Sequence, residues 1–353
     1  MSYFTFNNDL GIDLGTANTL VHVSGKGIML NEPSYIAIDR RTSKVLATGS
    51  DARIMAGRTP SRIEVIRPLQ GGVIGDLTMT RKLLETLIVK ISSLHKMGMR
   101  PRLVVGVPGN VTEVEKRAVR HAGLKAGAAQ VFLVEEPLAA ALGAGLPVNE
   151  PTASMVVDIG AGTAEVTVIS LGGIIVTRST RSAGNAFDQA LIEFARSQFN
   201  LAVGERRAEI AKINIGSAFP MEQELHYTLH GLDMLSKLPK SVEVSSVELR
   251  EVFNRPLQLI IEVVKQALVE TPAELFTDII EHGITLIGGG ALLPGLDRRL
   301  SKETGLQVHL ATDPLLCVVR GTGIIVESLK NEKYLQVIAA SQEERRYRIT
   351  SRL

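Results

Sequence analysis

The sequence predicts an α/β protein with two similar lobes, and three observations support this fold class. One short segment occurs twice, as LGIDLGTANT at residues 10–19 and as VVDIGAGT at residues 156–163. Predicted strands alternate with predicted helices along the chain, which is typical of layered α/β folds. The chain has 353 residues, which is enough for two lobes that each bury a core of their own.

Each copy of the segment predicts a strand, a tight turn and a return strand. An apolar run leads to an aspartate, Asp13 or Asp158, and small residues follow it. The return strands show the alternation of a β-strand, with apolar residues at Leu20, Val21 and Val23 in the first copy and at Val166, Val168 and Ile169 in the second. A glycine pair follows each return strand, Gly25 and Gly27 or Gly172 and Gly173.

The chemistry of these turns favours a phosphate ligand. Glycine and alanine let backbone N–H groups wrap a phosphate, because no large side chain blocks the turn. An aspartate at the end of the first strand is placed to hold a hydrated divalent cation beside that phosphate. A single hairpin of this kind is equally well explained as an ordinary turn. Two matched copies favour one nucleotide bound between two similar halves.

The rest of the first half predicts a small appended subdomain followed by alternating helices and strands. Short strands and Pro-marked turns fill residues 31–76. Apolar residues at helical spacing predict a helix over residues 78–96, with Thr80 as a possible N-cap. The pairing of Thr112 with Glu115 predicts a capping box at the start of a further helix. Buried strands are expected at residues 102–107 and 130–134, and Pro137 opens a small-residue helix.

The second half repeats this order with different additions. We expect a helix over residues 188–198, a charged helix over 204–216 and a strand-rich excursion to about residue 244. A long amphipathic helix over residues 246–269 is predicted to be interrupted or bent near Pro256. A strand over residues 284–287 then ends in three glycines.

We expect a division into two cores, each with an appended subdomain. The predicted boundaries are residues 1–32, 70–147 and 315–353 for the core of lobe I, 33–69 for its appended subdomain, 148–180 and 245–314 for the core of lobe II, and 181–244 for its appended subdomain.

Bulk composition excludes several classes of protein. The formal net charge of +2 is too small to predict a nucleic-acid partner. The single cysteine, Cys317, excludes an intramolecular disulfide and fits a reducing compartment. The N-terminal residues lack the features of a secretory signal, and no apolar run approaches the ~20 residues of a spanning helix. A cytoplasmic protein is expected.

Three glycine-bearing turns, at residues 15–18, 160–163 and 288–291, each follow an apolar strand. In this order they resemble the two phosphate loops and the adenosine loop of the actin-like ATPase superfamily. Within it, the sequence is similar to the MreB family of bacterial actins over about residues 9–328. The motifs that carry this likeness are DLGTANT (13–19), VTEVEKR (111–117), EEP (135–137), SMVVDIG (154–160), GGGALL (288–293) and RGTG (320–323).

The resemblance implies a fold of the actin and ribonuclease-H type, with four subdomains and a nucleotide cleft between the lobes. It implies ATP and Mg²⁺ as cofactors, and ATP hydrolysis coupled to assembly into filaments that organise cell-wall synthesis and rod shape. The partners implied are other copies of the chain, an anionic membrane surface and membrane-embedded cell-wall synthesis proteins. The expected location is cytoplasmic, peripheral on the inner face of the cell membrane.

The resemblance also assigns roles to single residues. The first phosphate turn comprises Gly15, Thr16, Ala17 and Asn18, and the second comprises Gly160, Ala161, Gly162 and Thr163, with Gly184 nearby. By this resemblance, Asp13 and Asp158 hold water around Mg²⁺, and Asp158 is also expected to be a catalytic residue. The adenosine loop comprises Gly288, Gly289, Gly290 and Ala291.

Two pairs of residues leave alternatives open. Glu136 is the candidate for orienting the attacking water, with Thr163 assisting, and the neighbouring Glu135 is its rival. Glu209 and Lys212, three apart on one helix face, resemble the pair that contacts ribose and adenine, but a surface salt bridge would show the same spacing. Ala161 stands where the family usually has glycine, which is tolerable if its φ is negative and strained if it is not.

Membrane contact is a further hypothesis. Leu94, Met97 and Met99 lie beside basic residues, where MreB relatives carry an apolar membrane-binding loop. The alternative is that these side chains pack on the protein itself.

Three other functions fit the same fold. A small-molecule (sugar) kinase would need a catalytic base for the acceptor hydroxyl, for which no second aspartate stands in a recognisable context. A chaperone ATPase lobe would need a peptide-binding domain. A nucleotide-binding scaffold would assemble without hydrolysing ATP.

Overall fold

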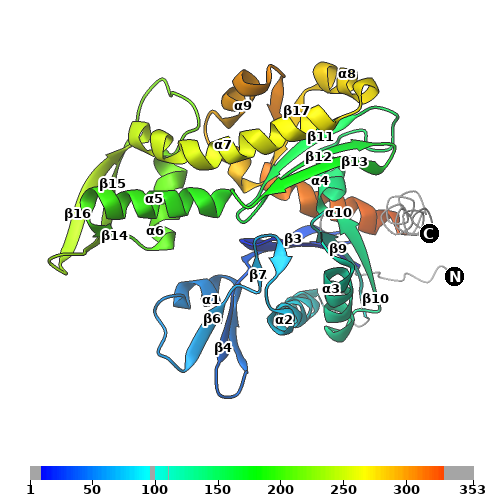
Figure 1. The fold of residues 1–353 in the computed structure, drawn as a ribbon. Helices are drawn as coiled ribbons and strands as arrows, with labels where there is room; N and C mark the ends of the chain where they lie inside the picture. Colours follow the sequence, from blue (N-terminus) through cyan, green and yellow to red (C-terminus); the bar gives the residue numbers. More distant parts are fainter. Residues whose placement is uncertain (1–8, 96–99, 110, 330–353) are drawn as a thin grey trace, which may run out of the picture. The chain divides into compact units, whose positions relative to one another are not determined.

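The structure is a computed structural model that describes residues 9–95, 100–109 and 111–329, without the side chains of residue 73 and residues 92–95. The chain forms two compact units (Figure 1). Unit 1 contains Met1–Pro151, Ser170–Gly173 and Leu316–Leu353, and unit 2 contains Thr152–Ile169 and Ile174–Leu315. Both units combine helices with mixed sheets, so the predicted α/β class is confirmed.

Unit 1 is built on a five-stranded sheet in the order β10-β9-β1-β2-β3. Its strands are β1 (Leu10–Leu14), β2 (Asn18–Val23), β3 (Gly27–Pro33), β9 (Arg102–Val107) and β10 (Gln130–Glu135). Strands β1, β2 and β3 pair antiparallel, whereas β1, β9 and β10 run parallel. The predicted hairpin around Asp13 is therefore the centre of this sheet.

Unit 2 contains a second five-stranded sheet, in the order β13-β12-β11-β17-β18. Its strands are β11 (Ser154–Ile159), β12 (Ala164–Ser170), β13 (Gly173–Thr180), β17 (Ile284–Ile287) and β18 (Val308–Leu310). Strand β11 pairs antiparallel with β12 and parallel with β17, which pairs parallel with β18. The repeated segment thus occupies the same place in two sheets of the same order, which agrees with the two similar lobes that its duplication predicted.

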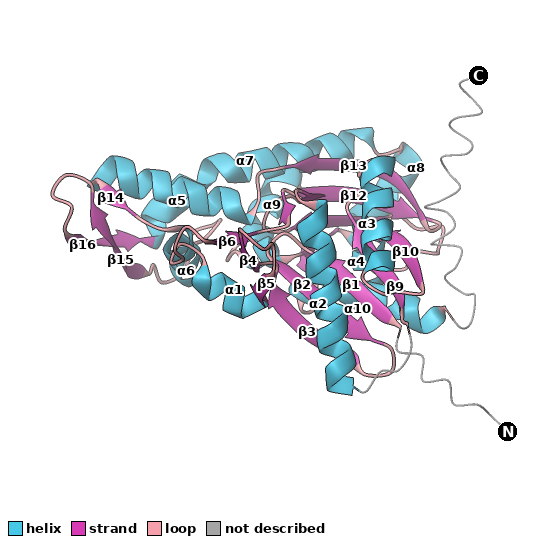
Figure 2. Ribbon diagram, turned by 90° about the horizontal axis from the view of Figure 1, so that it is seen from below, coloured by secondary structure: helices cyan, strands magenta, loops and turns pink. Residues whose placement is uncertain are grey.

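Helices cover both faces of the sheet in unit 1 (Figures 1 and 2). These are α2 (Leu77–His95), α3 (Glu113–Lys125), α4 (Glu136–Gly143) and α10 (Cys317–Ser328). Side chains of α2 and α3 form one core with Leu10, Ile12 and Leu14 of β1. On the other face, α10 approaches so closely that a Cβ on Gly11 would lie 2.8 Å from the backbone of Thr322.

The predicted helix starts in unit 1 have different outcomes. Thr112 caps α3, and the reciprocal hydrogen bonds with Glu115 confirm the capping box. The prediction for Thr80 is wrong, because α2 begins at Leu77 and Asp76 accepts the backbone N–H of Met79 at 2.9 Å. Asp76 immediately precedes the helix, so its carboxylate reaches the amide of the third helical residue, as an N-cap requires.

The smaller elements of unit 1 lie between β3 and α2. They are β4 (Ile36–Asp39), β5 (Val45–Thr48), α1 (Gly49–Met55), β6 (Ile63–Ile66), β7 (Leu69–Gln70) and β8 (Val73–Ile74). Strands β5, β4 and β6 form a three-stranded sheet with a small core at Ile36, Ile38 and Met79.

Unit 2 has a larger set of helices and a second small sheet. These elements are α5 (Gly184–Phe199), β14 (Leu201–Ala202), α6 (Glu205–Ile215), β15 (His226–Asp233), β16 (Pro239–Ser245), α7 (Ser246–Glu270), α8 (Ala273–His282), the 3₁₀ turns η1 (Gly289–Leu292) and η2 (Pro314–Leu316), and α9 (Leu296–Thr304). Strands β14, β15 and β16 form the small sheet.

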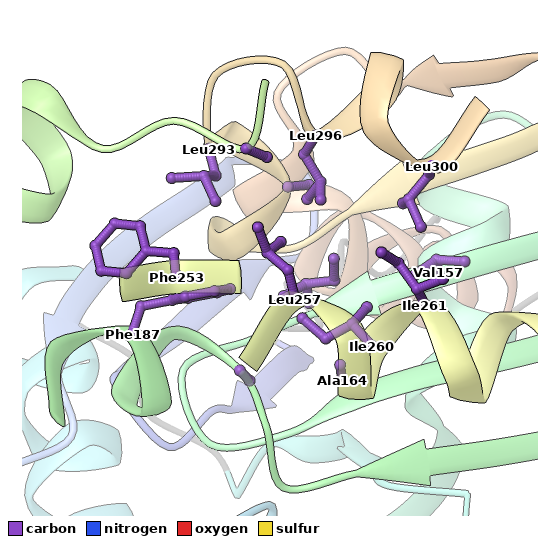
Figure 3. Close-up of a cluster of buried hydrophobic side chains, with 14 of the residues drawn as sticks. Val157, Ala164, Phe187, Phe253, Leu257, Ile260, Ile261, Leu293, Leu296 and Leu300 are labelled. Atoms are coloured by element: carbon purple, nitrogen blue, oxygen red, sulfur yellow. The ribbon is translucent and has the colours of Figure 1, made fainter. Parts of the chain in front are cut away.

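Helix α7 is the centre of the core of unit 2. Figure 3 shows Leu257, Ile260 and Ile261 of α7 among buried residues of β11, β12 and α9. The rings of Phe187 and Phe253 meet edge to face, 5.2 Å apart. An interruption or a bend was predicted near Pro256, and the interruption is wrong, because α7 runs through this residue as one helix. Burial of apolar side chains on both sides of Pro256 outweighs the lost hydrogen bond, which costs about 3 kcal/mol.

Among the described residues, no helix has both the length and the apolar composition needed to cross a membrane.

Candidate functional site

The first phosphate turn joins β1 to β2 in unit 1. Asp13 is buried on the sheet face opposite Ile12 and Leu14, which belong to the core. A Cβ on Gly15 would lie 2.6 Å from the carbonyl oxygen of Asn18, so only glycine closes this turn.

Neighbouring segments hold the first turn in place. The hydroxyl of Ser34 donates to the Gly15 carbonyl at 2.6 Å and also lies 2.8 Å from the Thr19 hydroxyl. Thr16 Oγ1 accepts the backbone N–H of Gly72 at 3.2 Å. The turn is therefore fixed before any ligand arrives.

The second phosphate turn joins β11 to β12 in unit 2. Gly160 N donates to Thr163 O at 2.9 Å, which closes the turn. The φ of Ala161 is not positive, so the alanine causes no left-handed strain. Asp158 lies on the face opposite the core residues Val157 and Ile159. Desolvation raises the pKa of Asp158 to about 6, and a cation beside it would favour the charged form.

The N-terminus of α5 lies directly against the second turn. Gly184 N donates to Gly160 O at 3.1 Å, and Asn185 N donates to Ala161 O at 2.7 Å. A Cβ on Gly184 would lie 3.2 Å from Gly160 O and 3.3 Å from the Cα of Ala161. The structure thus brings Gly184 beside the turn, and a larger residue would press on it.

The third glycine turn follows β17 and packs on the end of β11. Gly288 has φ of 80°, and a Cβ there would collide with the carboxylate of Asp158 and lie 2.5 Å from Ile159 O. A Cβ on Gly290 would collide with the side chain of Ile159. Unit 2 therefore places the second and third turns together around Asp158.

Helix α6 carries Glu209 and Lys212. The ammonium of Lys212 lies 2.8 Å from Asp188 Oδ1 and donates to Gly184 O at 2.9 Å. Both partners belong to α5, so Lys212 connects α6 to the second turn. Asp188 was not among the predicted site residues. The available signal was its position four residues after Gly184, on the same helix face.

The two neighbouring glutamates of unit 1 face different groups. Glu135 ends β10, and its Oε1 lies 3.7 Å from the ammonium of the buried Lys116. Glu136 is the first residue of α4, and a Cβ on Gly106 would lie 3.2 Å from its Cγ. Because β1, β9 and β10 are parallel, Glu136 stands at the same sheet edge as Asp13, where α/β folds bind ligands.

The side chains of the predicted membrane residues are outside the described part of the structure. Leu94 belongs to the last turn of α2, but its side chain is not described, and Met97 and Met99 lie among residues 96–99.

The carboxylates fit a metal that arrives with a phosphate ligand. Within the described residues, no group of three or more His, Cys, Asp and Glu side chains could hold a metal ion. Mg²⁺ is usually bound through one or two carboxylates, several waters and the phosphates of a substrate. Asp13 of unit 1 and Asp158 of unit 2 each offer a single carboxylate, and either one by itself suits a water-mediated contact to a metal rather than an ion cage made only of protein.

Comparisons with known proteins agree with this geometry. The family described as MreB/Mbl protein matches residues 7–334. The chain belongs to the MreB/Mbl family. The cell shape-determining protein MreB of Escherichia coli (strain K12) is 48% identical to it over 328 residues, which cover 92% of this chain and 94% of that protein. The resemblance stated from the sequence motifs is thereby confirmed.

Solved structures of an MreB protein are similar along nearly the whole chain. MreB5 of Spiroplasma citri bound to ADP has a TM-score of 0.86 and 36% identity, and covers 91% of this chain and 98% of its own. The same protein bound to AMPPNP has a TM-score of 0.86 and 37% identity, with 92% and 97% coverage. This chain thus has the actin-like fold of these relatives.

Proposed function

We propose that this chain is an actin-like cytoskeletal ATPase that polymerises into membrane-associated filaments and helps to determine rod shape by organising cell-wall synthesis. The observation that carries the proposal is the repeated hairpin with its aspartate, in a chain 37% identical to a protein crystallised with AMPPNP. The cell-shape role is supported by the E. coli relative, which is 48% identical.

Nucleotide binding would use the three glycine turns. Each of the turns at residues 15–18 and 160–163 would donate backbone N–H groups to phosphates of ATP, because glycine and alanine leave the backbone accessible. The turn at residues 288–291, together with Glu209 and Lys212, would contact the nucleoside. Asp13 and Asp158 would hold waters around a magnesium ion, which neutralises phosphate charge when it is bound.

Hydrolysis would depend on Glu136, with the hydroxyl of Thr163 assisting. The choice over Glu135 rests on its neighbour: the carboxylate of Glu135 is held in an ion pair with the ammonium of Lys116 at 3.7 Å, on the side of α3. Glu136 stands at the sheet edge of Asp13 and would orient the attacking water. In phosphoryl transfer, such positioning and charge neutralisation supply most of the rate enhancement.

The first test measures ATP affinity and phosphate release together. We expect Glu136→Gln to bind ATP within a fewfold of wild type and to release phosphate at least about 100-fold more slowly. Glu135→Gln is the matched control and should lose much less activity. Asp158→Asn should weaken binding of Mg-ATP. Equal and negligible release from wild type and Glu136→Gln would favour a scaffold that does not hydrolyse ATP, and phosphorylation of sugars would favour a kinase.

The second test examines assembly on lipid. Electron microscopy of the protein with Mg-ATP on an anionic lipid monolayer should show filaments that are absent without nucleotide and in Asp158→Ala. The variant that carries both Leu94→Ser and Met97→Ser should form filaments in solution but not on the monolayer. Bare lipid in every condition, with ATP binding intact, would contradict the filament proposal.

A further inference from the structure

A short series of polar contacts joins α6 to the second phosphate turn. The ammonium of Lys212 contacts Asp188 Oδ1 at 2.8 Å and Gly184 O at 2.9 Å. Gly184 N in turn donates to Gly160 O at 3.1 Å. All four residues belong to unit 2. A side chain from α6 is thus linked to the backbone of the turn through the first helical turn of α5.

The ion pair is largely removed from water. The side chains of Lys212 and Asp188 are only 17% and 13% exposed. Desolvation is the largest effect on the Asp188 carboxyl, and it raises the pKa of this group. The ammonium of Lys212 opposes the rise, whereas the negative charges of Glu209 and Glu205 on α6 add to it. An uncompensated charge at such a position is costly. The ammonium is therefore held where it neutralises Asp188.

Packing keeps α5 from adjusting around this pair. Phe187, the residue before Asp188, is 2% exposed and lies with its ring edge to face against Phe253 of α7. Asp188 stands one helical turn after Gly184, so its carboxylate has a fixed place relative to the N-terminus of the helix. A movement of Lys212 would have to be followed by Gly184 and by the turn at Gly160.

We infer that Asp188 is a positioning residue, which acts through Lys212 to couple recognition of the nucleoside by α6 to the geometry of the second phosphate turn. The inference rests on the proposed function, because it assumes that ATP binds at these turns. Asp188 fixes the ammonium on the Gly184 carbonyl, so that α6 and the turn behave as one rigid piece. A ligand with both a nucleoside and phosphates then gains more binding affinity from this coupling than a ligand with phosphates alone.

The experiment compares ATP with inorganic tripolyphosphate, which has no nucleoside. Dissociation constants of both ligands are measured with Mg²⁺ for wild type, Asp188→Asn, Lys212→Met and the double variant. We expect Asp188→Asn to weaken ATP binding about tenfold, the effect of losing one charged hydrogen bond. The dissociation constant of tripolyphosphate should change by less than about twofold. The preference of the variant for ATP over tripolyphosphate therefore falls.

The double variant tests whether Asp188 acts through Lys212. In the Lys212→Met background, Asp188→Asn should cause no further loss of ATP affinity, which is the non-additivity expected of coupled residues. Glu193→Gln, an exposed carboxylate on the same helix, is the matched control and should leave both constants unchanged. Thermal unfolding of each variant checks that the fold is intact.

The possible failures are distinguishable. If wild type binds no ATP, the proposed function fails. If wild type binds ATP but Asp188→Asn keeps the wild-type ratio of the two constants, the coupling is overturned and the proposed function stands. Additive losses in the double variant would also overturn the coupling.

Discussion

Gly106 at the end of β9 and Glu136 at the start of α4 are in contact, because a Cβ on Gly106 would lie only 3.2 Å from the Cγ of Glu136. The absent side chain leaves the space that Glu136 occupies. Val318 of α10 limits the same space, with its Cγ1 at 3.4 Å from the Cβ position. Glycine at position 106 therefore leaves room for the Cγ of Glu136 in its present place.

Gly106→Ala should slow ATP hydrolysis while leaving ATP affinity within about twofold. The added methyl group displaces Glu136 by a few tenths of an ångström, and a small misplacement of a group that orients a reactant can cost roughly tenfold in rate. Phosphate release under saturating ATP measures the effect. Gly204→Ala, where a Cβ meets nothing within 4 Å, is the control. An unchanged rate would contradict the role given to Glu136.

Phe187→Ala should destabilise unit 2 by about 3–5 kcal/mol, because it removes a buried ring and leaves a cavity. The ring is 2% exposed and packs on Phe253 at 5.2 Å. Urea unfolding followed by circular dichroism measures the free energy of unfolding. Phe194→Ala on the same helix removes a ring that is only partly buried, and we expect less than half the loss. Equal losses of unfolding free energy would show that the Phe187–Phe253 contact adds no more stability than the contacts of Phe194.

Gly321→Ala should destabilise unit 1, because α4 and α10 cross at glycines. A Cβ on Gly321 would collide with the carbonyl of Ala139, and a Cβ on Gly143 would collide with that of Cys317. Backbone atoms cannot rotate away, so the cost should reach at least the ~1–3 kcal/mol of an overpacked core. The midpoint of thermal unfolding measures it. Ser328→Ala, at the partly exposed C-terminal end of α10, should shift the midpoint little.

Asp39→Asn should remove a pH-dependent part of the stability of unit 1. Hydrogen bonds from the backbone of Thr42 and from the guanidinium of Arg62 lower the pKa of Asp39 from 3.8 to about 2. The unfolded chain binds the proton more readily, so this stabilisation is complete above pH 3.8 and is lost as the pH falls through about 2.

Thermal midpoints of wild type and Asp39→Asn, measured from pH 6 down to the lowest pH at which the protein folds, test this sign. The difference between the two should be constant above about pH 4 and shrink below it. Asp51→Asn, on the exposed face of α1, controls for the loss of one surface carboxylate. A difference that does not change with pH would contradict the argument.

The sequence by itself determined the elements whose signals are local or repeated. The hairpins around Asp13 and Asp158 follow from alternating apolar residues and a small-residue turn, and both lie at the centres of their sheets. The capping box of Thr112 and Glu115 involves residues only three apart, so the sequence alone predicts its hydrogen bonds. The repeat of the hairpin also predicted two similar lobes.

Only the tertiary structure decided contacts between residues far apart in the chain. Lys212 has its ion partner 24 residues away, at Asp188, because α5 and α6 pack together. The different surroundings of Glu135 and Glu136 come from Lys116 and Gly106, which lie on other elements. The continuity of α7 at Pro256 depends on burial against other elements. Local patterns reach only about one helical turn or one cross-strand pair, whereas these contacts arise from packing of the whole unit.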